Sequence, residues 1–372
     1  MVLTVKTSPL AFLKRNWGLV LSFSRKISYF IRRLGNLGGI FMSTKIGING
    51  FGRIGRLVLR VAINDPEIEV VALNSTSNPE GTARLFEFDS THGRFQGEIS
   101  FDDEHLIING KKIFLYSDRD PNNLDWAKVG ADIVIDSTGK FKTLETASVH
   151  LQRGAKKVII TAPSPDAPML VMGVNHQTYD KAQNIISNAS CTTNCLAPVT
   201  KVIHENFTIK AAAMTTVHSF TNDQKNLDNR HKDPRRARGC VQSIIPTTTG
   251  AAKAMGKIIP ELSGKMNGFA LRVPTPNVSL TDVVFELEES PSVEEINALL
   301  KKASESELKG ILGYEERPLV SIDYNTDPRS SIVDALSTMK IGEHLYKIIA
   351  WYDNEWGYSN RTVDLAKFID QA

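Results

Sequence analysis

A glycine-rich turn between a short apolar run and an amphipathic run is the feature that most constrains the fold of this chain. Residues 45–49 have the composition of a buried strand, Gly50-Phe51-Gly52-Arg53-Ile54-Gly55 follows, and residues 56–63 have helical spacing. A second buried strand is expected at residues 69–73. Glycines in this context allow a tight turn, close approach of the backbone to a pyrophosphate, and close packing of helix on strand. The order predicts a βαβ unit that binds a dinucleotide; the alternative is a glycine-rich turn without a ligand.

Further strand signals follow in the first half of the chain. Residues 106–108 and 112–115 are joined by Asn109-Gly110, which predicts a two-residue hairpin. Residues 133–135 and 158–160 have the composition of buried parallel strands, and small polar residues follow each of them. Because ligands of open α/β sheets lie at the carboxyl ends of the strands, these polar residues are candidates for ligand contacts.

A thiol stands at the predicted start of a helix. Residues 190–195 read Ser-Cys-Thr-Thr-Asn-Cys, just before an amphipathic run that ends near Phe207. Ser190 suits an N-cap, which would place Cys191 in the first turn, where free N–H groups and the helix dipole favour a thiolate. A thiolate attacks carbonyls, and His218 ends an apolar strand-like run downstream. The pair predicts nucleophilic catalysis; the alternative is a buried structural cysteine.

After Cys191 the pattern changes to longer strand-like runs, with a helical stretch at residues 292–303. Such an alternation predicts an α+β unit with a mostly antiparallel sheet. The strands are expected at residues 211–217, 269–273, 280–286 and 346–351.

The chain is therefore expected to contain an α/β Rossmann-type dinucleotide-binding domain and an α+β catalytic domain. The first would cover residues 42–190 and be completed by a C-terminal helix at 355–372, and the second would cover residues 191–354.

Composition excludes several classes of protein. Seven of the 44 Lys and Arg residues lie in residues 1–42, which contain no acid, so the remainder has 37 basic and 41 acidic residues. A mildly acidic body argues against an obligate nucleic-acid partner. Three cysteines without metal-ligand spacing indicate neither a disulfide scaffold nor a metal site, and they favour a reducing, cytoplasmic compartment.

Residues 1–41 form a basic extension with two interpretations. Its composition resembles an organellar transit peptide, and its apolar stretches are too short to span a membrane. Met42 directly precedes the first core strand, and Gly38-Gly39-Ile40-Phe41-Met42 is what a ribosome-binding site would encode if it were translated. We favour the second interpretation, a start codon assigned too far upstream.

Six motifs resemble those of phosphorylating glyceraldehyde-3-phosphate dehydrogenases, and the resemblance covers the chain from about Met42 onward. They lie at residues 45–56, 187–195, 215–224, 244–253, 271–279 and 351–361. The resemblance implies that Cys191 attacks the aldehyde of glyceraldehyde 3-phosphate and that His218 promotes its ionisation and accepts a proton during hydride transfer. Inorganic phosphate then releases the thioester as an acyl phosphate.

The resemblance also implies two anion sites, for which arginine forks and hydroxyl groups are suitable donors. The substrate phosphate would contact Thr221, Arg238 and Arg272, and the attacking phosphate would contact Ser190, Thr192, Thr249 and Gly250. A solvated basic turn is the alternative for Arg238 and its neighbours.

Further residues are implied to bind the cofactor beside the glycine turn. Asn354 would orient the nicotinamide carboxamide, with Tyr358 nearby, and the remaining contacts would come from Asn49, Arg53, Ile54, Arg119, Ser137, Thr138 and Thr161.

Two departures from the family pattern bear on cofactor choice. NAD-using members carry Asn-Asp after the second strand, where this chain has Asn74-Ser75, so the carboxylate that repels a 2′-phosphate is missing. Asn229-Arg230 replaces a usual Leu-Pro in a loop that, in the family, reaches a neighbouring subunit, although Arg230 could simply be exposed. Both departures resemble the bacterial NADP-preferring, gluconeogenic branch, so NADP is expected in preference to NAD.

Other functions remain as alternatives. One is the NAD-dependent glycolytic form, another is erythrose-4-phosphate oxidation with hydrolysis of the thioester, and a third is a thiol redox sensor or surface-binding role centred on Cys191. The resemblance further implies a homotetramer, and no obligate membrane partner is expected.

Overall fold

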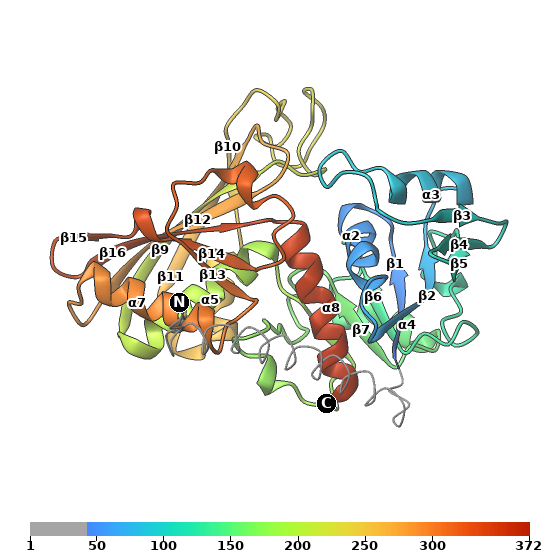
Figure 1. Ribbon diagram of the computed structural model, residues 1–372, viewed down its shortest axis with the longest axis horizontal. Helices are drawn as coiled ribbons and strands as arrows, with labels where there is room; N and C mark the ends of the chain where they lie inside the picture. The colour runs from blue at the N-terminus through green and yellow to red at the C-terminus, as the bar shows by residue number, and fades with distance from the viewer. Residues whose placement is uncertain (1–42) are drawn as a thin grey trace, which may run out of the picture. The chain divides into compact units, whose positions relative to one another are not determined.

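The structure, a computed structural model, describes residues 43–372, so the predictions for residues 1–41 lie outside it. Two eight-stranded sheets organise the described residues, one formed before residue 190 and one after it (Figure 1). Within the same range, no helix is both long and apolar enough to cross a bilayer. The predicted combination of an α/β and an α+β unit is confirmed.

The first sheet has the strand order β3-β4-β5-β2-β1-β6-β7-β8. Neighbours from β5 to β8 pair in parallel, whereas β3 and β4 form an antiparallel edge. Asn109 and Gly110 both have positive φ, 50° and 79°, which confirms the hairpin predicted between β4 and β5. The strands are β1 (Thr44–Asn49), β2 (Ile68–Asn74), β3 (Ile99–Phe101), β4 (His105–Ile108), β5 (Lys111–Tyr116), β6 (Ile133–Asp136), β7 (Lys157–Ile160) and β8 (Ile185–Ser187).

Strand order reverses beside β1, because β2 pairs with one of its edges and β6 with the other. In open α/β sheets this reversal opens a crevice at the carboxyl ends of the strands, where ligands bind. The helices that accompany this sheet are α2 (Arg53–Ala62), α3 (Pro79–Glu87) and α4 (Leu144–Gln152).

The second sheet has the order β10-β11-β9-β12-β16-β14-β13, with β15 paired to β16. Its pairs are antiparallel except β9 with β11 and β13 with β14. Its strands are β9 (Ile209–Ser219), β10 (Ile245–Thr248), β11 (Met266–Val273), β12 (Ser279–Leu287), β13 (Leu312–Glu315), β14 (Ser331–Asp334), β15 (Met339–Ile341) and β16 (Leu345–Tyr352). Helices α5 (Cys191–Asn206), α6 (Ala251–Ile258) and α7 (Val293–Glu305) belong to the same half.

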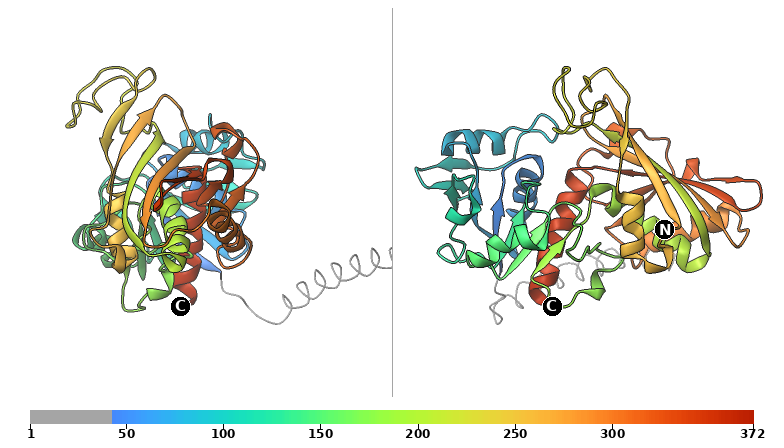
Figure 2. Two further views of the ribbon diagram at one scale, coloured as in Figure 1. Left: turned by 90° about the vertical axis from the view of Figure 1, so that its left-hand side faces the viewer. Right: turned by 180° about the vertical axis from the view of Figure 1, so that it is seen from behind.

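Helix α8 (Trp356–Gln371) returns to the first sheet after the second is complete, and it lies between the two sheets in Figure 1 and in the right-hand view of Figure 2. It contacts α2 and β1, and its buried Leu365 and Ile369 share an apolar core with Ile46 of β1. Thr44 Oγ1 donates a hydrogen bond of 2.6 Å to Asp370. This contact fixes the far end of α8 against the first strand.

Gly55 allows α2 to start against the turn that precedes it. A Cβ atom built on Gly55 would lie 2.0 Å from the carbonyl oxygen of Gly50, whereas one on Gly52 would have no neighbour within 4 Å. Gly50 itself has a φ of +98°, a region that favours glycine. The glycine turn is therefore needed for backbone geometry as well as for ligand approach.

We expect Gly55→Ala to lower the free energy of unfolding by about 1–3 kcal/mol, because a backbone oxygen cannot move away without displacing the helix. Gly52→Ala is the matched control and should cost less than about 1 kcal/mol. Urea denaturation of both variants measures the difference. Equal losses would contradict the packing role of Gly55.

Candidate active site

A cavity of about 720 Å³ collects residues from both halves of the chain. Twelve of the predicted site residues line it: Arg53, Ile54, Ser137, Thr138, Thr161, Ser190, Cys191, Thr221, His218, Arg272, Asn354 and Tyr358. Eight further residues complete the lining: Thr91, Ala162, Pro163, Phe220, Asn222, Asp223, Pro276 and Glu355. Of these, Thr91 alone has no signal in the sequence, since the others follow a predicted parallel strand or lie in the motifs at residues 215–224, 271–279 and 351–361.

The start of α5 places Cys191 beside His218 at the end of β9. Ser190 is the N-cap, as predicted, and its Oγ accepts a hydrogen bond of 3.0 Å from the N–H of Thr193. Cys191 Sγ then lies 3.5 Å from His218 Nε2. Two residues from separate elements thus form a nucleophile and base pair within reach of proton transfer.

The other ring nitrogen of His218 faces the backbone. Nδ1 lies 2.7 Å from the carbonyl oxygen of Ser219, which can only accept, and a proton on Nδ1 leaves Nε2 free to accept one from Cys191. Arg272 Nη1 donates to the same carbonyl at 2.9 Å and lies 2.7 Å from Nδ1. The guanidinium therefore stands directly behind the imidazole.

Burial controls the protonation of this pair. It raises the pKa of the Cys191 thiol, while the charge of Arg272 and a hydrogen bond from the Thr192 backbone act to lower it. Burial, followed by repulsion from Arg272, lowers the pKa of His218 to about 3. The imidazole is thus neutral at pH 7, the form that accepts a proton. The thiolate expected at the helix N-terminus is opposed by desolvation of the sulfur.

Tyr352 packs against His218 and bonds to Thr192, and it is not among the predicted site residues. Its hydroxyl lies 2.9 Å from Thr192 Oγ1 and 2.9 Å from Thr216 Oγ1, and its ring packs edge-on against His218. Burial raises the pKa of Tyr352 well above its usual value, so it stays protonated. Thr192 is consequently buried beneath the cavity, with its hydroxyl bonded to the tyrosine, and does not line it.

The structure does not bring the remaining predicted phosphate ligands to the cavity. Arg238 is exposed, and its Nε donates to Asp228 at 3.0 Å. Thr249 Oγ1 accepts from the N–H of Ala251 at the start of α6, beside Gly250. In these positions the three residues lie outside the cavity that contains Arg272 and Cys191.

A second cavity, of about 400 Å³, lies over the glycine turn. Its predicted members are Asn49, Gly50, Phe51, Gly52, Ser75, Arg119 and Thr138, and it is completed by Asn74, Thr76, Ser77, Asp118, Lys140 and Phe141. Gly55 packs against the turn, and the exposed Arg230 lines neither cavity. Helix α2 begins at this turn without a capping side chain, so N–H groups of its first turn remain to donate to a pyrophosphate. The residues present therefore fit a dinucleotide.

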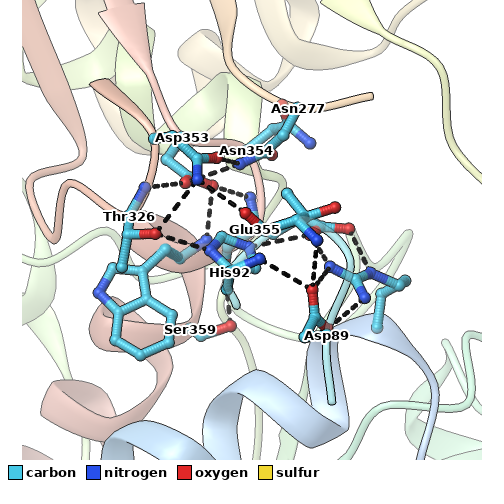
Figure 3. A network of polar contacts seen from close by, with 12 residues as sticks. Asp89, His92, Asn277, Thr326, Asp353, Asn354, Glu355 and Ser359 are labelled. Atoms are coloured by element: carbon cyan, nitrogen blue, oxygen red, sulfur yellow. Dashed lines mark hydrogen bonds and ion pairs between the residues drawn. The ribbon is translucent and has the colours of Figure 1, made fainter. Parts of the chain in front are cut away.

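An ion-pair network holds Arg53 in the wall of the first cavity, at the start of α2. Its guanidinium pairs with both Asp89 and Glu355, and Glu355 also lies 3.1 Å from His92 Nε2 (Figure 3). Burial acts to raise the pKa of Glu355, but the pKa is lowered overall, and the hydrogen bond from Arg53 is the main cause of this lowering. Asp89 has no signal in the sequence, and although Glu355 lies in the motif at residues 351–361, its pairing with Arg53 arises only in the folded chain.

Comparison with known proteins identifies two matching family models. Residues 44–144 match the model of the glyceraldehyde 3-phosphate dehydrogenase NAD binding domain, and residues 190–354 match that of the C-terminal domain.

Curated relatives match over most of their length. A glyceraldehyde-3-phosphate dehydrogenase of Geobacillus stearothermophilus is 58% identical over 330 residues, which are 88% of this chain and 98% of that protein. Two proteins of Bacillus subtilis, glyceraldehyde-3-phosphate dehydrogenases 1 and 2, are 56% and 52% identical over 88% of the chain and 98% and 97% of their own lengths.

We expect iodoacetamide to label Cys191 well before Cys195. Burial raises the pKa of Cys195 to about 12, so at a pH of about 8 only about one molecule in 10⁴ carries that thiolate. Labelling of Cys191 should rise with pH as its thiol ionises, and peptide mass spectrometry measures both sites. Cys195→Ser should keep the fast labelling and Cys191→Ser should lose it. Fast labelling of Cys195 would contradict the prediction that Cys191 is the more reactive thiol.

Proposed function

We propose how this chain, which belongs to the glyceraldehyde 3-phosphate dehydrogenase family, carries out the oxidative phosphorylation of its aldehyde substrate. The proposal rests on one observation, the 3.5 Å approach of Cys191 Sγ to His218 Nε2 in a cavity shared with Arg272 and Asn354.

The first step forms a bond between sulfur and carbon. Cys191 Sγ attacks the aldehyde carbon while His218 Nε2 accepts the thiol proton and returns it to the carbonyl oxygen, which gives a hemithioacetal. His218 then accepts that hydroxyl proton as a hydride leaves the carbon, and a thioester remains on Cys191. A nicotinamide held by Asn354 and Tyr358 would supply the hydride acceptor.

The second step releases the product. An oxygen of inorganic phosphate attacks the thioester carbon, the carbon–sulfur bond breaks, and the sulfur leaves as the 1,3-bisphosphoglycerate forms. Arg272 and Thr221 line the cavity and are suited to hold phosphate oxygens, and Ser190 lies beside the sulfur. We assign Thr192, Arg238, Thr249 and Gly250 to the same two anion sites on the family resemblance alone, since they lie outside this cavity.

We propose that the cofactor lies along the two cavities. Asn354 and Tyr358 would contact the nicotinamide, and Asn49, the glycine turn and Arg119 would surround the adenosine. Arg53 and Ile54 start α2 between these groups, near the position proposed for the pyrophosphate.

We infer a preference for NADP over NAD from Ser75. Its buried Oγ accepts hydrogen bonds from Thr82 Oγ1 at 2.9 Å and from the N–H of Ser77 at 3.3 Å. With its acceptor capacity used, the hydroxyl is suited to donate its hydrogen, which favours a phosphate oxygen as partner.

The charged residues of the second cavity, which Ser75 also lines, support the preference for NADP. Arg119 and Lys140 line it together with Asp118. Both carboxylate oxygens of Asp118 already accept hydrogen bonds of 2.8 Å, from the N–H of Asp120 and from Asn123 Nδ2. The exposed Arg230 lines neither this cavity nor the first one, so it would add a further cation only from a neighbouring subunit.

We also propose a cytoplasmic homotetramer. The segment between β9 and β10 extends beyond its sheet in Figure 2 and exposes Leu227, Val241 and Ile244, which supports burial against another subunit. Three free cysteines are compatible with a reducing compartment.

We expect His218→Asn to reduce kcat by about 10²–10⁴-fold, because the proton acceptor is lost. Binding of the dinucleotide should not change, and His344→Asn, at a side chain that is 41% exposed, is the matched control.

In the unchanged enzyme, omission of phosphate should stop reduction of the cofactor after one equivalent per site. Continued turnover without phosphate would instead support thioester hydrolysis and an erythrose-4-phosphate dehydrogenase.

We expect Ser75→Asp to shift the ratio of kcat/KM for NADP to that for NAD by at least about tenfold toward NAD, through repulsion of the 2′-phosphate. Ser100→Asp, an exposed change of equal charge on β3, should leave the ratio unchanged. An unchanged enzyme that already prefers NAD would end the proposed preference.

A further inference from the structure

A buried serine connects the catalytic base to the residue that faces the nicotinamide. Ser279 begins β12, and its Oγ accepts a hydrogen bond of 3.1 Å from the N–H of Ser219. The same Oγ donates to Asn354 Oδ1 at 2.8 Å. Ser219, Ser279 and Asn354 are 0%, 1% and 5% exposed, so water does not substitute for these bonds.

The direction of these bonds follows from the donors available. A backbone N–H can only donate, so the bond from Ser219 uses a lone pair of Ser279 Oγ. The serine hydrogen is then left to donate, and the oxygen of the Asn354 amide is the acceptor that lies beside it. The flipped amide, with its nitrogen toward Ser279, would leave the buried hydroxyl hydrogen without this acceptor.

We propose that Ser279 is a positioning residue that fixes the amide of Asn354 with its Nδ2 directed toward the nicotinamide carboxamide. The proposal rests on the proposed function, in which Asn354 contacts the nicotinamide. Asn354 lines the main cavity, and no hydrogen bond of its Nδ2 occurs to another described residue, whereas its Oδ1 is held by Ser279. The side-chain nitrogen is thus the part of Asn354 available to a cofactor oxygen.

Ser219 extends this arrangement to the catalytic base. Its N–H holds Ser279, and its carbonyl oxygen accepts from Arg272 Nη1 and lies 2.7 Å from His218 Nδ1. Its own Oγ donates to the carbonyl of Val278 at 2.7 Å, which ties the end of β9 to the residue before Ser279. Ser219 therefore orients the imidazole of His218 directly and the amide of Asn354 through Ser279.

The experiment compares Ser279→Ala with Thr281→Val. Thr281 is the next residue on the same face of β12, is 1% exposed, and has a hydroxyl that contacts Cys195 and the carbonyl of Ala350. We expect Ser279→Ala to raise KM for the better cofactor about tenfold, as a misoriented amide loses one hydrogen bond. Affinity for ADP-ribose, or for its 2′-phosphate if NADP is preferred, should stay within about twofold. Thr281→Val should change neither quantity.

A double variant separates positioning from a general loss of structure. In an Asn354→Ala background, Ser279→Ala should have no further effect on KM, because the amide that it orients is gone. Loss of ADP-ribose binding in Ser279→Ala would indicate that this variant does not fold. In that case Ser279→Thr, which keeps the hydroxyl, must retain the original KM. An unchanged KM in folded Ser279→Ala, or equal effects in both backgrounds, would overturn the proposal. An unchanged KM in Asn354→Ala alone would instead contradict the proposed role of Asn354.

Discussion

The contact between Cys191 and His218 depends on two elements that the chain brings together only in its folded state. Helix α5 begins at the sulfur, and β9 ends at the imidazole, so their meeting requires the helix to pack on the second sheet with its N-terminus at the strand end. Burial then determines the chemistry of the pair, because it favours an uncharged ring and an uncharged thiol. The positive charge of Arg272 partly offsets this for the sulfur. A neutral base next to a poorly solvated nucleophile is suited to move one proton as a bond forms.

Local signals in the sequence were sufficient for the elements whose pattern arises within a few residues. The turn at Gly50–Gly55 combines positive φ with close helix packing, which only glycine satisfies, and Asn109-Gly110 has the φ values of a two-residue hairpin. The N-cap at Ser190 is equally local, since its oxygen bonds to the N–H three residues later. Six short strands, β3, β8, β10, β13, β14 and β15, were not anticipated, because none of them contains three consecutive apolar residues. The equally short β4, β6 and β7 each contain such a run and were predicted.

Other parts of the site depend on long-range contacts that no local pattern contains. Arg53 meets Glu355 across 302 residues of sequence, and Thr192 meets Tyr352 across 160. Arg238 shows the opposite case, since a basic side chain predicted to bind phosphate pairs with Asp228 on its own loop. The sequence therefore indicated which residue types the chemistry needs, whereas their partners and accessibility required the folded chain.

Helix α8 also has a consequence for how the protein is made. Its apolar side chains complete the core around β1, yet Thr44 and Asp370 are separated by 326 residues. While a ribosome is still translating the second sheet, the first sheet has emerged without the helix that covers its opening strand and α2. That apolar face stays open to solvent and to chaperones until residues 356–371 have been synthesised, so the nucleotide-binding half can close only after the whole second sheet has been made.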